Sequence, residues 1–396
     1  MMETQRRKAI VIGAGLAGSA ACERLAARGW DITLIERHAQ PAQETSGNLA
    51  GVFMPSLSKD DNLSSRLTRA AYLFALERWQ SPGAIGSAFS GATCGVLQLA
   101  RNAQHAELQR EIAAIWQYPG DFAQWLEAPA ASKLLGTATP VGGWFFPRGG
   151  WVHPGELCKS MLAACGAQLQ TCYECDASTL LYEDENWQVR DRHCSVIASA
   201  PTLIIASGNS APQLAQSASL PLTSVRGQVS HFAAERMTAL PLVVCREGYL
   251  TPPTQGICSV GASYDPDDDA HLRQDSHAGN LQRLADIHPA LAAGLADQPM
   301  RGRVGFRSVS PDRLPLVGQL PDTEAMKKFR GDRLKDIPRL PGLYCLLGYA
   351  SRGLIWAPLA AELLACRLSQ ETLPIESDLV NAIDPARFAL KAHRRQ

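Results

Sequence analysis

Three glycines and one glutamate near the N-terminus have the residue types and spacing of a dinucleotide-binding site. Gly13, Gly15 and Gly18 form a G-x-G-x-x-G pattern, and Glu36 stands at the end of the predicted strand 31–35, 23 residues after Gly13. In this pattern the first glycine permits a tight turn, the second lets the backbone approach a pyrophosphate, and the third lets a helix pack closely on a strand. The glutamate accepts hydrogen bonds from ribose hydroxyls and repels a 2′-phosphate. The pattern predicts dinucleotide binding but does not distinguish FAD from NAD.

The surrounding elements have the order strand, turn, helix, strand that such a site requires. Residues 9–12 are all apolar, as in a buried parallel strand, and a helix is predicted to about Arg28, with Gly29 as its C-terminal cap. The helix N-terminus would offer free N–H groups and a positive dipole end to phosphates. A basic start before an apolar run is also typical of a signal peptide, but the amphipathic helix that continues through Glu23 favours the dinucleotide site.

The composition is that of an ordinary soluble globular protein of two or three domains. Its 396 residues are 46% hydrophobic and 19% charged, and 38 basic residues balance 38 acidic ones. A formal charge of zero argues against a large electrostatic footprint for nucleic acid or anionic membrane, so any nucleic-acid contact must be a local patch. Eleven cysteines without framework spacing predict free thiols in a reducing cytoplasm, and no stretch reads as a membrane span.

The rest of the chain predicts further helices and strands of an α/β protein. Helical patterns cover residues 60–80, 154–165 and 354–368, and buried strands are expected at residues 202–206 and 342–347. Alternating runs at residues 168–172 and 187–190 predict a small antiparallel meander.

Several stretches resemble a known group of flavoenzymes. The glycine-rich fingerprint, the strand ending at Ser207 and Gly208, and the glycine-rich turn before the last helix are similar to the glycine oxidase and D-amino-acid oxidase group of FAD enzymes. The resemblance narrows to the FAD-dependent C-terminal domain of the MnmC-type bifunctional enzymes, which modify the wobble uridine of tRNA. Its most specific stretches are residues 45–55, 145–154, 225–229, 307–318 and 351–353.

The resemblance implies an FAD-binding Rossmann-like domain and a second, mainly antiparallel-sheet substrate domain, as in D-amino-acid oxidase. The two domains are expected to interleave along the chain. The FAD-binding domain would comprise residues 1–80, 152–218 and 306–372, the substrate domain residues 81–151 and 219–305, and a basic tail residues 373–396.

The resemblance also implies a reaction. FAD would oxidise the carboxymethyl C–N bond of 5-carboxymethylaminomethyl(-2-thio)uridine at tRNA position 34, and hydrolysis would give 5-aminomethyl(-2-thio)uridine and glyoxylate. The family's methyltransferase domain is missing from this sequence, so we expect no methylation step, and a separate methyltransferase is a candidate partner beside tRNA. One alternative is a glycine or D-amino-acid oxidase acting on a free small amino acid or secondary amine. Another is a non-catalytic flavin-binding module that docks onto a partner.

Two residues are expected to contact the substrate. Arg307 matches an arginine that holds the substrate carboxylate in related amino-acid oxidases, and a planar guanidinium binds a carboxylate in bidentate fashion. The alternative is an ion pair between Arg307 and an acid such as Asp312. Tyr249 is similar to a strand tyrosine that lines the substrate pocket in relatives, and the alternative is a tyrosine packed on a sheet.

The remaining predicted site residues would hold FAD. The stretch from Ser46 to Gly51 resembles a second flavin loop, and the N-terminus of the last helix would stabilise negative charge on the flavin ring. Neither Thr45–Asn48 nor Phe306–Ser310 contains the Cys or His that attaches flavin covalently in some relatives, so FAD is expected to be non-covalent. The predicted FAD-binding residues are Gly13, Gly15, Gly18, Glu36, Arg37, Ser46, Gly47, Asn48, Gly51, Ser207, Gly208, Gly348, Ser351, Arg352, Gly353 and Leu354.

Other groups of residues are interpreted as structural or solvated, and no metal site is predicted. Cys172 and Cys175 would point to opposite faces of a strand. The acidic run from Asp265 to His271 would be a solvated loop after a strand. Two basic segments are expected either to be solvated at the surface or to contact tRNA phosphates. Their basic residues are Lys327, Lys328, Arg330, Arg333, Lys335 and Arg339 in one, and Arg387, Lys391, Arg394 and Arg395 in the other.

Overall fold

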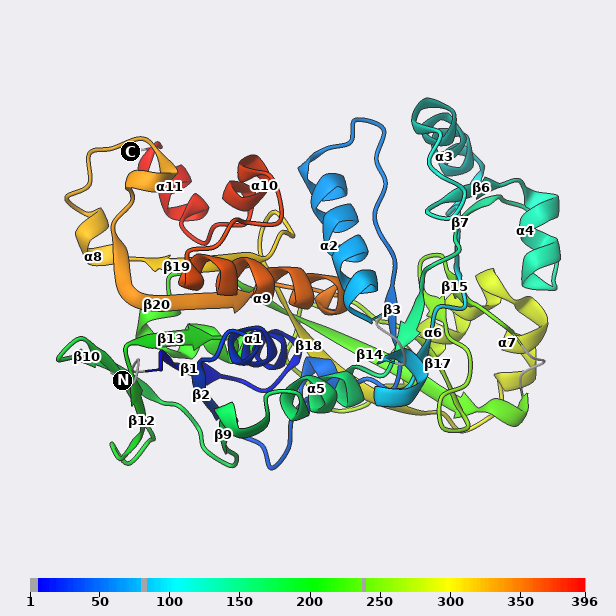
Figure 1. Cartoon of the computed structure of the whole chain (residues 1–396). Helices are drawn as coiled ribbons and strands as arrows, with labels where there is room; N and C mark the ends of the chain where they lie inside the picture. The colour runs from blue at the N-terminus through cyan, green and yellow to red at the C-terminus, as the bar shows by residue number, and fades with distance from the viewer. Residues whose placement is uncertain (1–5, 80–83, 237–239, 396) are drawn as a thin grey trace. The chain divides into compact units, whose positions relative to one another are not determined.

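The computed structural model describes residues 6–79, 84–236 and 240–395, and the chain divides into two compact units (Figure 1). Unit 1 comprises Met1–Gly47, Gly155–Ser224 and Arg307–Gln396. Unit 2 comprises Asn48–Pro154 and Val225–Phe306. Among the described residues, no helix is both long and apolar enough to cross a membrane.

Unit 1 contains a six-stranded sheet in the order β19-β20-β13-β1-β2-β9. Its neighbouring strands are parallel except for the antiparallel pair β19–β20. The elements of unit 1 are β1 (Lys8–Ile12), α1 (Leu16–Ala26), β2 (Asp31–Ile35), α5 (Pro154–Ala163, whose first residue belongs to unit 2), β9 (Leu169–Cys172), β10 (Thr179–Glu183), β11 (Asn186–Arg190), β12 (Val196–Ala200), β13 (Thr202–Ile205), β19 (Leu316–Pro321), α8 (Thr323–Met326), β20 (Arg339–Leu347), α9 (Gly353–Ser369), α10 (Ser377–Ala382) and α11 (Arg387–His393).

The two faces of this sheet are covered by different layers. Helices α1 and α9 pack together, and Val11 of β1 faces α1, where it would contact any side chain placed at Gly18. On the other face, Ile10 and Leu203 belong to an apolar cluster shared with the small sheet β10-β11-β12. Because β1 and β13 are covered on both faces, they are apolar along nearly their whole length.

The predicted meander is only partly right. Strand β9 pairs in parallel with β2 and forms the edge of the six-stranded sheet. The antiparallel meander is instead β10-β11-β12. An alternating apolar pattern identifies a strand but does not identify its partner, which is why the sequence placed residues 168–172 in the wrong sheet.

Unit 2 contains an eight-stranded mixed sheet in the order β18-β14-β17-β16-β15-β5-β7-β6 and a small sheet β3-β8-β4. The large sheet is mainly antiparallel, although β15 and β5 pair in parallel. The elements are β3 (Gly51–Phe53), α2 (Leu63–Trp79), β4 (Gly91–Ala92), β5 (Val96–Leu99), α3 (Ala103–Trp116), β6 (Gln124–Leu126), α4 (Ala128–Leu135), β7 (Gly143–Phe146), β8 (Gly150–Val152), β15 (Val243–Cys245), β16 (Tyr249–Leu250), β17 (Ile257–Gly261), α6 (Gln274–Ile287) and α7 (Pro289–Leu295); β14 (Thr223–Ala233) and β18 (Arg301–Val309) run across the unit boundaries.

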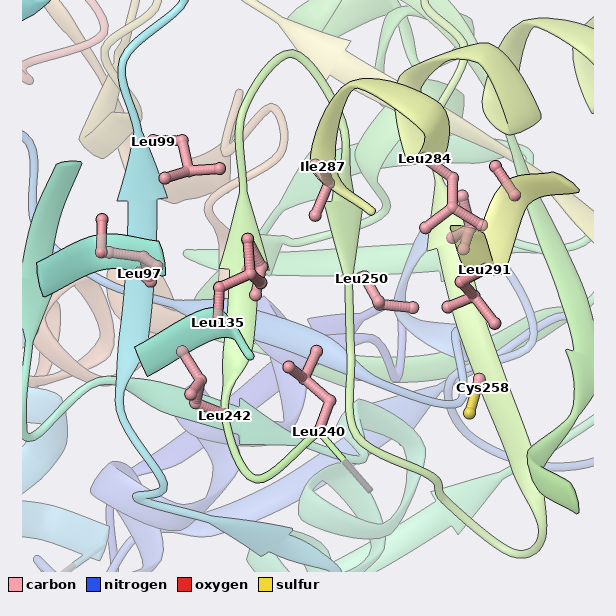
Figure 2. Close-up of a cluster of buried hydrophobic side chains, with 14 of the residues drawn as sticks. Leu97, Leu99, Leu135, Leu240, Leu242, Leu250, Cys258, Leu284, Ile287 and Leu291 are labelled. Carbon is pink, nitrogen blue, oxygen red and sulfur yellow. The ribbon is translucent and has the colours of Figure 1, made fainter. Parts of the chain in front are cut away.

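One face of the large sheet is apolar and packs on helices. Alternate residues Leu97 and Leu99 of β5 join Leu284 and Ile287 of α6 in one buried cluster (Figure 2). Val244 of β15 belongs to the same cluster. The period of two in the strands leaves the intervening residues, Tyr249 among them, on the opposite face. The α/β fold class is therefore confirmed, with a Rossmann-like unit and a mainly antiparallel unit.

The unit boundaries differ by more than a few residues from the expected domain boundaries in two places. Residues 48–79, predicted within the FAD-binding domain, group with unit 2, because Tyr72 of α2 has ring contacts with Phe53 and Phe122 of that unit. The predicted boundary between residues 80 and 81 lies outside the described residues. Residues 373–395, predicted as a separate basic tail, group with unit 1 and contain the helices α10 and α11.

Candidate active site

The predicted glycine-rich loop connects β1 to α1 and leaves no room for a side chain at Gly13 or Gly18. Gly13 has a φ of +103°, and a Cβ there would lie 2.7 Å from the carbonyl oxygen of Ala206. A Cβ at Gly18 would overlap the carbonyl oxygen of Gly13. Gly15 is the N-cap residue of α1, and the first turn of that helix has no acidic side chain. The loop therefore presents a bare helix N-terminus, which suits an anionic group.

Glu36 is fixed beside this loop at the end of β2. The side chain is only 8% exposed, and its two oxygens accept hydrogen bonds from the N–H of Ala14 at 2.7 Å and the N–H of His38 at 2.9 Å. A carboxylate has about four acceptor positions, so two remain for other donors. Arg37, predicted with Glu36, forms an exposed ion pair with Glu44.

The predicted second flavin loop is divided by the unit boundary. Ser46 and Gly47 lie in unit 1, where the Ser46 hydroxyl accepts a hydrogen bond from the N–H of Leu16 at 3.1 Å, in the first turn of α1. Asn48 and Gly51 lie in unit 2; the Asn48 side-chain oxygen accepts a hydrogen bond from Arg303, and Gly51 begins β3. Ser46 thus stands at the helix end where a phosphate is predicted.

Ser207 and Gly208 follow β13 and lie against the glycine-rich loop. The Cα of Ser207 is 3.0 Å from the position that a Cβ on Gly13 would occupy. The Ser207 hydroxyl is buried and has no hydrogen-bond partner in the part of the chain that the structure describes. A buried polar group without a hydrogen-bond partner lowers the stability of a folded protein by roughly 1–3 kcal/mol. A polar ligand that forms a hydrogen bond with the Ser207 hydroxyl would therefore be stabilised there.

The predicted C-terminal loop connects β20 to α9. Gly348 has a φ of +72°, and the N–H of Ala350 donates a hydrogen bond to the carbonyl of Ser308 at 3.0 Å. Ser351 and Arg352 are exposed, and Arg352 is the N-cap residue of α9. A Cβ on Gly353 would lie 3.2 Å from Leu16, and Leu354 is buried. The N-terminus of α9 therefore lies beside the N-terminus of α1.

A half-buried carboxylate ties these two helices together. Glu362 of α9 pairs with Arg24 at 2.6 Å and with Arg28 at 2.8 Å, both from the α1 region. Burial alone would raise the pKa of Glu362, but the hydrogen bonds and charges of the two arginines outweigh burial and lower that pKa. Arg28 also pairs with Glu371 just beyond α9. This cluster links the C-terminal end of α1 to the second half of α9.

The two predicted substrate residues lie in different units. Arg307 is the first residue of the last segment of unit 1, on β18, whereas Tyr249 is on β16 of unit 2. Asp312, the acid considered as an alternative partner of Arg307, is paired with another arginine. It accepts two hydrogen bonds from Arg387, at 2.8 and 2.9 Å. The Tyr249 ring leans on Gly261, where an added Cβ would be 3.3 Å from its hydroxyl.

The cysteine pair and the acidic loop, both interpreted from the sequence as structural or solvated, have contacts that differ from those expected. Cys172 and Cys175 pack on the same apolar cluster, not on opposite faces, because β9 ends at Cys172 and a turn separates the two residues. The acidic loop is ion-paired: the buried Arg226 contacts Asp265, and Arg273 contacts Asp267 and Asp269. Among the described residues, no group of three or more His, Cys, Asp or Glu could hold a metal ion.

Sequence reasoning missed two hydroxyl groups in and beside the loop between β20 and α9. The side-chain oxygens of Ser308 and Tyr349 are buried, and the described residues offer neither a hydrogen-bond partner. Burial raises the pKa of the Tyr349 phenol well above its usual range, so this group is a neutral hydrogen-bond donor. Their only sequence signal was position, because Ser308 directly follows Arg307 and Tyr349 directly follows Gly348.

Sequence relatives match the chain along its whole length. It is 43% identical over 405 residues to the tRNA 5-methylaminomethyl-2-thiouridine biosynthesis bifunctional protein MnmC of Paraburkholderia phytofirmans, covering 100% of this chain and 61% of that protein. It is 44% identical to the protein of the same name from Burkholderia mallei over 99% of this chain and 61% of that protein. The chain thus spans about three fifths of the length of these curated relatives.

Solved structures share the fold at lower identity. Glycine oxidase from Geobacillus kaustophilus superposes with a TM-score of 0.77 at 19% identity, over 97% of this chain and 99% of the other. Iminodiacetate oxidase from Chelativorans sp. has a TM-score of 0.73 at 23% identity, over 93% of this chain and 97% of the other. Residues 8–367 match the family model described as FAD dependent oxidoreductase, and the chain is therefore a member of that FAD-dependent family.

Proposed function

We propose that this protein oxidatively removes the carboxymethyl group from 5-carboxymethylaminomethyl(-2-thio)uridine at position 34 of tRNA. The observation that carries this proposal is the identity of 43–44% along 98–100% of the chain with relatives named for tRNA 5-methylaminomethyl-2-thiouridine biosynthesis. Because the substrate is tRNA, we assign the reaction to the cytoplasm. We propose that a methyltransferase, in the same or in another polypeptide, carries out the methylation that follows.

The residues of unit 1 fit FAD. We propose that the pyrophosphate lies at the N-terminus of α1 beside Gly15 and Ser46, and that the two open acceptor positions of Glu36 receive ribose hydroxyls. The buried, unsatisfied hydroxyl of Ser207 supports this placement, because it lies against Gly13. At the second helix end, the N-terminus of α9 has no acidic side chain in its first turn and would favour negative charge on the flavin ring.

The chain's own residues would bind and orient the substrate. We assign Arg307 to the carboxylate, because a glycine-like group has one anionic handle and a guanidinium binds it at two points. We also propose Tyr249 as a residue that contacts the substrate. FAD, when bound, would supply the two-electron oxidation of the carboxymethyl C–N bond, with oxygen as the final electron acceptor. Loss of the amine proton leaves an imine of the substrate, and water converts this imine to 5-aminomethyl(-2-thio)uridine and glyoxylate. Substrate, oxygen and water thus give the amine, glyoxylate and hydrogen peroxide.

Anaerobic reduction of the bound flavin tests this function. Holoprotein mixed without oxygen with tRNA that contains 5-carboxymethylaminomethyluridine should lose its flavin absorbance, whereas the same tRNA with unmodified uridine 34 should have no effect. Bleaching by free glycine or a free secondary amine, but not by the tRNA, would instead identify a small-amine oxidase. No bleaching by any of these compounds would identify a non-catalytic flavin-binding module.

A further inference from the structure

The two basic segments that are 50 to 60 residues apart in the sequence form one surface in unit 1. The region 322–338 connects β19 to β20, and α11 lies beside it near the C-terminus (Figure 1). A small apolar cluster joins them: Ile337 packs with Leu390 of α11, and Phe329 packs on the same cluster. The basic residues near the C-terminus are therefore held in place by packing.

Two further contacts fix the same arrangement. The rings of Phe329 and His393 have their centroids 5.3 Å apart, and the guanidinium of Arg394 donates a hydrogen bond to the backbone carbonyl of Asp332. Because one face of α11 is anchored in this way, Lys391 and Arg395 are exposed on the outside. The two segments therefore present their cationic groups together.

Ion pairs neutralise only some of these charges. Lys327 pairs with Glu324, Arg333 with Asp336, Arg339 with Asp384 and Arg387 with Asp312. Six exposed cationic side chains have no carboxylate within ion-pair distance in the described ranges. We name these six the C-terminal basic patch: Lys328, Arg330, Lys335, Lys391, Arg394 and Arg395. In a chain of zero formal charge, such a group is a local electropositive surface.

The patch lies far from the loop between β20 and α9, which is predicted to contact the flavin. It adjoins the beginning of β20, at Arg339, whereas Gly348 follows the end of that strand. Nine strand residues separate the two ends by roughly 25–30 Å. A free amino acid at the flavin cannot touch both places, but a folded RNA whose reacting nucleotide is at the flavin extends far enough to do so.

The geometry points to the C-terminal basic patch as a docking surface for the sugar–phosphate backbone of the tRNA substrate. This inference rests on the proposed function, which supplies a polyanionic macromolecular substrate. Lysine and arginine contacts to phosphates release bound counterions, so their contribution appears as a salt dependence of affinity. The patch would position the tRNA without reading its sequence, because backbone contacts fix register but do not distinguish bases.

Two charge-reversal variants of the holoprotein test the docking surface. The patch variant is Lys328→Glu, Lys391→Glu and Arg395→Glu. The control is Lys133→Glu, Lys159→Glu and Arg192→Glu, which changes three exposed residues elsewhere by the same total charge. Affinity for tRNA with 5-carboxymethylaminomethyluridine is measured by fluorescence anisotropy at several salt concentrations. Flavin content and urea unfolding show whether each variant is folded.

We expect the patch variant to bind this tRNA at least about tenfold more weakly, and its slope of log affinity against log salt to fall by roughly two to three. The control should bind within about threefold of wild type. KM for tRNA should rise in the patch variant, while kcat at saturating tRNA stays near wild type, because the patch is remote from the flavin.

The binding and turnover measurements separate this inference from the proposed function. Equal affinities and slopes in wild type and the folded patch variant would overturn the docking surface, even if wild type releases glyoxylate. Equal losses in the patch variant and the control would also overturn it, since they would reflect only total charge. If wild type binds the tRNA without releasing glyoxylate and the patch variant loses that binding, the docking surface stands and the proposed function fails.

Discussion

At the scale of single residues, Gly15 is the position where backbone and cofactor are expected to lie closest. A Cβ at Gly15 would already lie 3.1 Å from the Ser46 hydroxyl, and a branched side chain would extend into the proposed phosphate position. We predict that Gly15→Val abolishes FAD binding while the apoprotein still folds. The measurement is the ratio of flavin to protein absorbance after purification. Gly294→Val, where no atom lies within 4 Å of the new Cβ, is the control; normal flavin occupancy in Gly15→Val would contradict the assignment.

Arg307 is the residue on which substrate binding depends in this proposal. Arg307→Leu would leave the substrate carboxylate without its partner, which costs roughly 2–5 kcal/mol, or about 30- to several-thousand-fold in kcat/KM. Arg307→Lys keeps the charge but not the planar fork, so its activity should lie between wild type and Leu. The measurement is glyoxylate release from 5-carboxymethylaminomethyluridine tRNA.

Flavin content distinguishes this role of Arg307 from a structural one. It should stay near normal in both variants, because the proposed FAD contacts lie on the loops before α1 and α9. Arg301→Leu, an exposed arginine on the same strand, is the matched control. Parallel loss of flavin and activity in Arg307→Leu would make Arg307 a structural residue.

At the scale of elements, the packing of α9 on α1 includes the ion pairs of Glu362 with Arg24 and Arg28. Glu362→Gln removes the charge that two arginines share, and hydrogen bonds to charged groups contribute about 1.5–3 kcal/mol, so the free energy of unfolding at neutral pH should fall by that order. The pKa of Glu362 is lowered in the folded protein, so its contribution is complete above the unfolded pKa of about 4.3 and is lost as pH falls through the folded pKa.

Urea unfolding at several pH values tests this contribution of Glu362. The difference between wild type and Glu362→Gln should shrink as the pH falls below about 4. Glu324→Gln breaks an exposed pair with Lys327 and should change stability by less than about 1 kcal/mol. A difference that does not depend on pH would mean that the ionised carboxylate is not responsible.

The sequence predicted elements better than it predicted their partners. The glycine spacing located the α1 loop and Glu36 correctly, because strand, turn and helix in this motif are determined by neighbouring residues. The pairing of β9 with β2 and the assignment of α2 to unit 2 depend on contacts between distant residues, which local periodicity does not contain. The unsatisfied hydroxyls of Ser308 and Tyr349 likewise become visible only when the surrounding packing is known.

At the scale of the whole molecule, the cofactor is expected to be held by shape and hydrogen bonds alone. The stretches where relatives attach flavin covalently contain no Cys or His here, and the eleven cysteines are free thiols. Acid precipitation of the yellow holoprotein should therefore leave the flavin in the supernatant. Flavin absorbance that remains with the precipitated polypeptide would contradict the non-covalent assignment.

The central claim is that these 396 residues convert one wobble nucleoside into another, and nucleoside mass spectrometry measures this directly. Substrate tRNA containing 5-carboxymethylaminomethyl(-2-thio)uridine is incubated with holoprotein in air, digested and compared with the same tRNA before incubation. We predict conversion to 5-aminomethyl(-2-thio)uridine with one glyoxylate released for each nucleoside converted, and conversion at least about 30-fold slower with Arg307→Leu. An unchanged nucleoside profile with a fully loaded, reducible flavin would contradict the claim.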